Sequence, residues 1–305
     1  MAGTDAIPIR QADSIEAQLG AVRIAIEARL GTIVPSAQTW PVRLHEAQRH
    51  ALLAPGKRFR PLLCVFIARG GGHEGPAPID VGCIAEMVHA ASLILDDLPC
   101  MDDAALRRNQ PSTHIAFDES TAILTATALL NRAFGVLARL DGIDAAVRIE
   151  LVDMLSYAVG SKGLIAGQMA DLANTDIGAS IAEIERLNTL KTGALFDFSV
   201  EAAAVLAGLS SSRRAALKDF AYYLGLAFQL MDDVKDTVMD EDEAEKSVGR
   251  DIGKATIIAL TGPSAARDRL SGYIDMAKAA LARAKLGNMD ILTAIMDAQF
   301  AFLKP

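Results

Sequence analysis

Cysteine, aromatic residues and long apolar runs are all scarce in this sequence. Its three cysteines, Cys64, Cys83 and Cys100, show no Cys-x-x-Cys spacing, which argues against a disulfide framework and against a zinc site. Aromatic residues make up only 5%, and β-branched runs bounded by turns are rare, which argues against a β-rich fold. Polar residues or glycine interrupt the longest apolar stretches, so we expect no membrane span.

Other absences narrow the class further. The amino terminus has no basic region followed by an apolar run, so we expect no export, and the sparse cysteines fit the reducing cytoplasm. Only 11 prolines are present and no Pro/Ser-rich stretch marks a linker, so we expect a single domain over residues 1–305. The 30 basic against 38 acidic residues give a net charge of −8, and no basic tail indicates a nucleic-acid partner.

Apolar residues, in contrast, are abundant at 51% and recur at helical spacing. We predict an all-α fold, a large single-domain helical bundle around a central active-site cavity. The expected helices cover residues 12–31, 38–53, 58–70, 78–97, 116–138, 144–158, 161–174, 181–208, 211–236, 251–261, 264–285 and 289–302.

Two acidic motifs each close an apolar stretch. The first aspartate motif (residues 96–103) begins with Asp96-Asp97 and continues to Asp102. The second aspartate motif (residues 232–236) contains Asp232 and Asp236 at helical i, i+4 spacing. Carboxylates crowded at a buried helix end repel one another unless a cation joins them. Hard oxygen ligands of this kind suit Mg²⁺ that keeps waters and bridges to substrate phosphates, although either motif alone also fits a solvated helix end.

Basic residues are grouped close to these motifs. They are Lys57, Arg58 and Arg60 at the start of an expected helix, Arg107-Arg108 after the first motif, Lys191 before an apolar helix, and Lys246 with Lys254 after the second motif. A helix start adds backbone N–H groups that favour phosphate. Each group alone is typical of a solvated surface, but their order relative to the aspartates indicates an anionic ligand held by metal and cations together.

The sequence resembles the trans-isoprenyl diphosphate synthases. The matching pieces are Gly56-Lys-Arg-Phe-Arg-Pro61, His89, Asp96-Asp-x4-Asp102, Leu106-Arg-Arg108, Pro111-Ser-Thr-His114, Gly167-Gln168 with Asp171, Lys191-Thr-Gly-Ala194, and the segment 225–236 with Gln229 and Asp232-Asp233. Residues 86–103 look especially like the bacterial geranylgeranyl diphosphate synthases of carotenoid pathways.

The resemblance implies a role for each matching residue. Asp96, Asp102 and Asp232 would bind Mg²⁺ with the allylic diphosphate, and Asp97, Asp233 and Asp236 would support them. The allylic diphosphate, which would be dimethylallyl, geranyl or farnesyl diphosphate, would also contact Arg107, Lys191, Lys246 and Lys254, with Thr192 and Gln229 near the reacting carbon. Isopentenyl diphosphate would be held by Lys57, Arg60, His89 and Arg108. The resemblance also implies a homodimer.

Product length is expected to depend on the helix before the first motif. In the family a bulky residue five positions before that motif closes the tunnel for the growing tail, and here the position is Ala91, followed by Ser92. Met87 and Val88, one turn deeper, could form the tunnel floor or could simply be core residues. We expect a C20 product made from farnesyl diphosphate.

Other interpretations stay open at this point. Farnesyl diphosphate synthase is one, and a non-catalytic modulatory subunit of a prenyl synthase is another, although such subunits usually lose an aspartate motif. A terpene cyclase would share the magnesium chemistry but has no use for a second diphosphate site at Lys57, Arg60 and His89. Asn109, where the family usually has Gly, and Arg250, where it usually has Lys, leave the preferred substrate undetermined.

Overall fold

The chain is an assembly of helices in a computed structural model that describes residues 14–173, 180–238 and 256–303. The elements are α1 (Ile15–Ile33), α2 (Val42–Leu52), α3 (Phe59–Gly70), α4 (Ala77–Asp96), β1 (Leu106–Arg107), β2 (Gln110–Pro111), α5 (Thr113–Ala116), α6 (Glu119–Leu137), α7 (Ala145–Val159), α8 (Leu164–Leu172), α9 (Ile181–Asn188), the π-helical turn η1 (Thr189–Gly193), α10 (Ala194–Leu206), α11 (Ser211–Val238), α13 (Ile257–Thr261), α14 (Pro263–Arg283), α15 (Met289–Gln299) and the 3₁₀ turn η2 (Ala301–Leu303). The predicted all-α class is confirmed.

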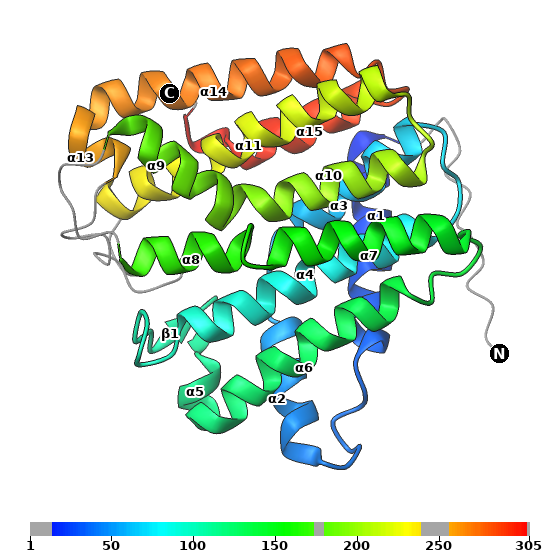
Figure 1. Cartoon of the computed structure of the whole chain (residues 1–305), viewed down its shortest axis with the longest axis vertical. Helices are drawn as coiled ribbons and strands as arrows, with labels where there is room; N and C mark the ends of the chain where they lie inside the picture. Colours follow the sequence, from blue (N-terminus) through cyan, green and yellow to red (C-terminus); the bar gives the residue numbers. More distant parts are fainter. Residues whose placement is uncertain (1–13, 174–179, 239–255, 304–305) are drawn as a thin grey trace.

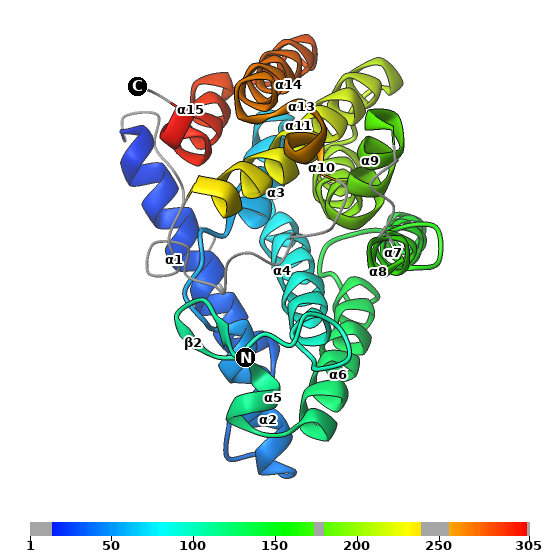
Figure 2. The same ribbon diagram turned by 90° about the vertical axis from the view of Figure 1, so that its left-hand side faces the viewer.

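Helix α4 lies at the centre of the bundle. It packs against α1, α2, α3, α6 and α10, and Figure 2 shows it running between α1 on one side and α6 on the other. Because neighbours surround it, α4 is apolar on nearly every face, and one buried charge, Glu86, interrupts it. The helix ends at Asp96, so the first aspartate motif emerges directly from the core.

A second group of helices covers α3 and α4. Helix α10 packs on α3 and α4, α11 packs on α10 and α14, and α15 returns to α3. These helices form the upper half of Figure 1. The buried apolar residues of the two groups join in one core that runs from Val22 in α1 to Phe300 after α15. Burial of this core is the main driving force that places the ends of α4 and α11.

Four expected helices differ in detail from the observed ones. The segment 116–138 contains α6 alone, because Asp118 adopts an extended conformation and caps α6 by accepting the Thr121 N–H. The segment 181–208 is interrupted by η1, and the segment 38–53 becomes helical only at Val42. Within the expected 251–261, the described part is helical from Ile257. The two-residue strands were not expected.

Helices α4 and α6 are long and apolar enough to cross a membrane by length and composition alone. The apolar window of α4 is 67% buried inside the protein, as for a core helix, whereas that of α6 is 44% buried. The expected absence of a membrane span remains a prediction.

Candidate active site

The first aspartate motif folds back onto the end of α4. Asp97 caps the helix through its N–H, which donates to the Leu93 carbonyl. The loop then returns, because the Asp102 N–H donates to the Asp96 carbonyl at 2.9 Å and the Ala104 N–H donates to the Asp97 carbonyl at 3.0 Å. These two bonds bring Asp96 and Asp102 together, although five positions separate them in the sequence.

Carboxylates crowd one another at this helix end. Burial raises the pKa of Asp96 to about 6; Lys191 and Arg107 act to lower it, while Asp102 and Asp97 raise it further. The crowding makes the ionised carboxylates an unfavourable arrangement for the protein alone. A cation bound here would favour their ionised form.

Arg107 and Arg108 lie on a short hairpin beside the motif. β1 pairs with β2 in antiparallel register, Arg107 opposite Gln110, and the two residues at the tip, Arg108 and Asn109, have φ of 53° and 59°. Positive φ at both central positions is typical of a type I′ hairpin turn, which asparagine tolerates well. Asn109 in place of the family's glycine is therefore compatible with the turn.

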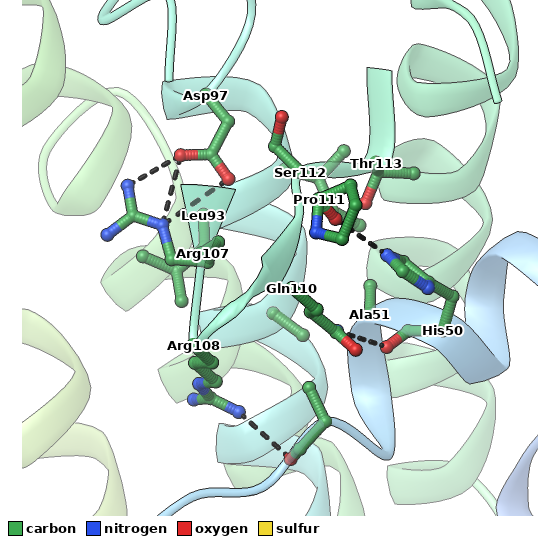
Figure 3. Close-up of a pocket in the computed structure, with 13 residues that line it drawn as sticks. His50, Ala51, Leu93, Asp97, Arg107, Arg108, Gln110, Pro111, Ser112 and Thr113 are labelled. Carbon is green, nitrogen blue, oxygen red and sulfur yellow. Dashed lines mark hydrogen bonds and ion pairs between the residues drawn. The ribbon is translucent and has the colours of Figure 1, made fainter. Parts of the chain in front are cut away.

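Arg107 is held by Asp97 in the pocket of Figure 3. Its Nη2 lies 2.5 Å from Asp97 Oδ1 and its Nε 3.0 Å from the same oxygen. Burial opposes the charge of Arg107, but the hydrogen bond and the nearby carboxylates Asp97, Asp96 and Asp102 outweigh it and raise its pKa. The predicted neighbours Asp97 and Arg107 are thus an ion pair.

Arg108 joins a second, buried group of charges. Glu86 Oε1 accepts from Arg58 Nη1 at 2.6 Å and from Arg108 Nη2 at 3.2 Å, and Arg58 Nε donates to Glu27 at 2.7 Å. Burial would raise the pKa of Glu86, but the positive charge of His89 in its protonated form and those of the two arginines lower it to about 2. Glu86 is therefore an anion that holds two guanidinium groups in place.

Arg60 and His89 border the same group. The Arg60 guanidinium lies 4.3 Å from the centre of the Phe196 ring and 5.4 Å from that of Phe228. Burial lowers its pKa to about 10, so it stays charged at neutral pH. Its buried Nε has no hydrogen-bond partner in the described part of the chain, which leaves a donor for an anion. Burial and Arg60 lower the pKa of His89, which favours the neutral imidazole.

A π-helical turn places Lys191 on the opposite side of the site. Lys191 Nζ lies 2.6 Å from Asp171 Oδ2 on α8. Gly167 permits this approach, because a Cβ there would lie 2.3 Å from the backbone nitrogen of Lys191. Short π-helical turns are frequent at functional sites.

The second aspartate motif is tied to that turn. Thr192 Oγ1 donates to Gln229 Oε1 at 2.5 Å, and Gln229 Nε2 donates to Asp233 Oδ1 at 2.9 Å. Asp232 is half-buried, and its negative charge acts to raise the pKa of Arg60. The side chain of Asp236, and Lys246 with Lys254, lie outside what the structure describes.

The expected chain-length residues lie on α4. Met87, Val88 and Ala91 are buried in the core, and Ser92 Oγ donates to the His89 carbonyl at 2.9 Å. The facing helix α6 contributes small buried residues, including Ala122 and Ala126.

Two clusters of charge result. The basic cluster consists of Lys57, Arg58, Arg60, Glu86, His89 and Arg108. The acidic cluster consists of Asp96, Asp97, Asp102, Arg107, Asp171 and Lys191, together with Asp232 and Asp233 of the second motif, which the Thr192–Gln229–Asp233 hydrogen bonds tie to the turn that carries Lys191. Lys57 is exposed on the loop before α3, and its neighbour Gly56 lies against Arg108, since a Cβ there would be 3.1 Å from Arg108 Nη1.

The acidic cluster fits magnesium by the chemistry of its donors. Asp96, Asp102 and Asp232 offer hard carboxylate oxygens, and burial together with the neighbouring carboxylates Asp102 and Asp97 raises the pKa of Asp96. No three metal-binding side chains converge within residues 14–173, 180–238 and 256–303. Mg²⁺ usually needs only one or two protein carboxylates besides waters and substrate phosphates, so the residues present fit an ion that binds together with a diphosphate.

Sequence reasoning assigned no role to three residues of this site. Arg58 and Glu86 form the centre of the basic cluster, and Asp171 pairs with Lys191. The signal for Glu86 was available, because a single charge within an apolar helix is rarely buried without a partner.

Comparisons with known proteins agree with this geometry. Residues 41–283 match the family model described as polyprenyl synthetase. The chain is 43% identical over 263 residues to a geranylgeranyl diphosphate synthase of Pantoea ananas, with 85% of each protein covered. It is 36% identical over 269 residues to a farnesyl diphosphate synthase of Geobacillus stearothermophilus, covering 87% of this chain and 90% of the relative.

A solved structure of similar fold contains the expected ligands. The geranyltransferase of Helicobacter pylori, complexed with magnesium and isoprenyl diphosphate, is 27% identical, with a TM-score of 0.83 and coverage of 97% of this chain and 99% of that one. The match extends over both charge clusters and most of the bundle. The chain therefore belongs to the polyprenyl synthetase family and is a prenyltransferase of isoprenoid biosynthesis.

Proposed function

We propose that this chain condenses isopentenyl diphosphate head-to-tail with allylic diphosphates, using Mg²⁺, and that geranylgeranyl diphosphate is the main product. The observation that carries the proposal is the presence of two separate charge clusters in one site. The basic cluster can bind one diphosphate through arginine side chains alone. The acidic cluster can bind another only with a metal ion.

The proposed reaction follows from this division. Arg107 and Lys191 would contact the allylic diphosphate, whose C–O bond breaks so that the electron pair leaves with the diphosphate. The chemistry that bound Mg²⁺ supplies is stabilisation of that departing charge. The double bond of isopentenyl diphosphate, held by the basic cluster, attacks the allylic carbon, and the proton lost afterwards is taken by the departed diphosphate. Thr192 and Gln229, joined by their hydrogen bond, would face the reacting carbon.

One incubation distinguishes the alternatives. The protein is mixed with Mg²⁺, isopentenyl diphosphate and dimethylallyl, geranyl or farnesyl diphosphate in turn, and products are separated by chromatography. Elongation to C20 supports the proposal, and accumulation at C15 identifies a farnesyl diphosphate synthase instead. A cyclised hydrocarbon would indicate a cyclase, and no turnover by a folded protein would indicate a modulatory subunit.

A single substitution tests the product length. Ala91 has no side chain beyond its methyl group and faces the core beside α6. The Ala91→Tyr variant should shift the main product from C20 toward C15, because the phenol ring would shorten the space for the tail. Ala85→Tyr, at a buried position six residues earlier on α4, controls for general disturbance of the core. Mainly C20 product from Ala91→Tyr would contradict the tunnel assignment.

We also propose that the chain forms a homodimer through α6 and α7. Ile123 and Leu124 on α6 and Ile149 on α7 are exposed apolar side chains on two helices that pack together. Analytical ultracentrifugation at micromolar concentration should give twice the mass of one chain.

The proposed location of the protein is the cytoplasm, supported by three cysteines that are all free thiols. Carotenoid synthesis is the proposed use of the product.

A further inference from the structure

The hairpin that carries Arg107 and Arg108 is too short to hold its own position. Each strand contributes two residues, and an isolated ribbon of this size is at best marginally stable in water. A small open pocket lies between the hairpin, α2 and α4 (Figure 3). Beside this pocket, polar contacts with neighbouring helices hold the hairpin.

Two reciprocal hydrogen bonds tie β2 to the last turn of α2. His50 Nε2 lies 2.9 Å from the Pro111 carbonyl, and Gln110 Nε2 donates to the His50 carbonyl at 3.0 Å (Figure 3). A carbonyl can only accept, so His50 Nε2 carries the proton. The His50 ring also lies edge-on to Phe117, with ring centres 5.6 Å apart. One residue of α2 thus contacts both ends of the segment 110–117.

The same turn of α2 leads into the loop that carries Lys57. This loop and the hairpin approach closely, since a Cβ on Gly56 would lie 3.1 Å from Arg108 Nη1. The distance between the loop and Arg108 therefore depends on how α2 is joined to β2. His50 is the residue whose hydrogen bonds connect α2 to β2.

We propose that His50 is a positioning residue that holds Arg108 at the site for isopentenyl diphosphate. The inference rests on the proposed function, which assigns that ligand to the basic cluster. Arg107 has a separate anchor in Asp97 on α4, whereas Arg108 has longer contacts, at 3.2 Å to Glu86 and 3.5 Å to the Ala54 carbonyl. Loosening β2 therefore displaces Arg108 more than Arg107.

Two substitutions of His50 separate the hydrogen bond from the packing. His50→Phe keeps a ring against Phe117 but removes the donor to Pro111, and His50→Gln restores a donor. In His50→Phe we expect the KM for isopentenyl diphosphate to rise about fivefold, the effect of one lost hydrogen bond, with the KM for farnesyl diphosphate changed by less than about twofold. His50→Gln should recover most of the difference.

A second histidine of α2 provides the matched control. His45 Nδ1 lies 2.8 Å from the Thr39 carbonyl, away from the hairpin, so His45→Phe should leave both KM values unchanged. Hydrogen exchange of the intact variants gives a readout without turnover. Exchange of the peptide 105–116, which includes the Ser112 N–H bonded to the Ala105 carbonyl, should accelerate about fivefold in His50→Phe only. Gln110→Met, which removes the reciprocal bond, should act in the same direction.

The outcomes are distinct for the two proposals. Unchanged exchange of 105–116 in His50→Phe, an equal rise of both KM values, or failure of His50→Gln to recover would overturn the role of His50. If the wild-type protein elongates no substrate while His50→Phe still accelerates exchange of the hairpin, the proposed function is wrong. The structural role of His50 in holding β2 to α2 would then still stand.

Discussion

The basic and acidic clusters differ in the sign of the charge that predominates in each. In the basic cluster, Glu86 is shared between Arg58 and Arg108, and within the described part of the chain no carboxylate is hydrogen-bonded to Arg60, so positive charge predominates there. In the acidic cluster, Arg107 and Lys191 are each paired with one aspartate, and among the residues that the structure describes there aspartates outnumber these two cations. Under the proposed function, a diphosphate would therefore bind directly to the first cluster but would need metal ions in the second.

The largest expected effect is the loss of a carboxylate from the acidic cluster. Asp96→Asn should lower kcat about a thousandfold, because the neutral amide binds a divalent ion far more weakly and departing diphosphate loses its stabilisation. Steady-state elongation of farnesyl diphosphate measures this. Asp103→Asn is the control, because Asp103 is exposed in the same loop and asparagine tolerates its φ of 48°. Similar activity of the two variants would contradict the assignment.

Removal of magnesium should weaken ligand binding at the acidic cluster far more than at the basic cluster. Calorimetric titration with one substrate at a time avoids turnover, because neither reacts alone. With EDTA in place of Mg²⁺, we expect farnesyl diphosphate to bind about a hundredfold more weakly and isopentenyl diphosphate to change by less than about threefold. Equal losses for both ligands would show that the clusters do not differ in their need for metal.

Loss of Glu86 should destabilise the protein in a pH-dependent way. Its pKa is depressed from 4.5 to about 2, so its stabilising contribution is present above pH 4.5 and disappears as pH falls toward 2. We expect Glu86→Gln to lower the free energy of unfolding by about 3 kcal/mol at pH 7. Urea unfolding at several pH values measures the gap, which should narrow in acid. A gap of constant size, or an equal loss in the exposed Glu74→Gln, would count against this account.

The smallest expected effect concerns the rings beneath Arg60. Phe228→Leu removes one aromatic face, 5.4 Å from the guanidinium, so isopentenyl diphosphate should bind about threefold more weakly. Binding of farnesyl diphosphate should not change. Phe220→Leu, on the same helix in the core, matches the packing change away from Arg60. An equal loss of affinity in both variants would assign the effect to packing.

Most of the fold was predictable because apolar periodicity and turn residues dominate it. The expected helices 58–70, 78–97 and 289–302 lie within about three residues of α3, α4 and the α15 segment. The hairpin was not predicted, because two-residue strands have no periodicity, and only Asn109 hinted at its turn. The turn η1 was hidden for a similar reason: residues of a π turn follow no pattern that separates them from an α-helix.

The motifs predicted the residues of the candidate site, but the pairing among them could be seen only in the three-dimensional structure. The aspartates and arginines were identified by their order along the chain, whereas the bonds from Glu86 to two arginines join residues 22 and 28 positions apart. Lys191 meets Asp171 because α8 and η1 touch at a glycine. Such pairings depend on helix packing, which single-sequence patterns do not encode.

The turn η1 also has a consequence for how this chain can change. A π turn holds one residue more than the α-helix would need, so deleting one residue within Thr189–Gly193 would let α9 and α10 merge into a continuous helix. That helix would be more regular, but Lys191 and Thr192 would rotate away from Asp171 and Gln229. At this segment, a more regular helix would therefore come only with the loss of the side-chain arrangement on which the proposed reaction depends.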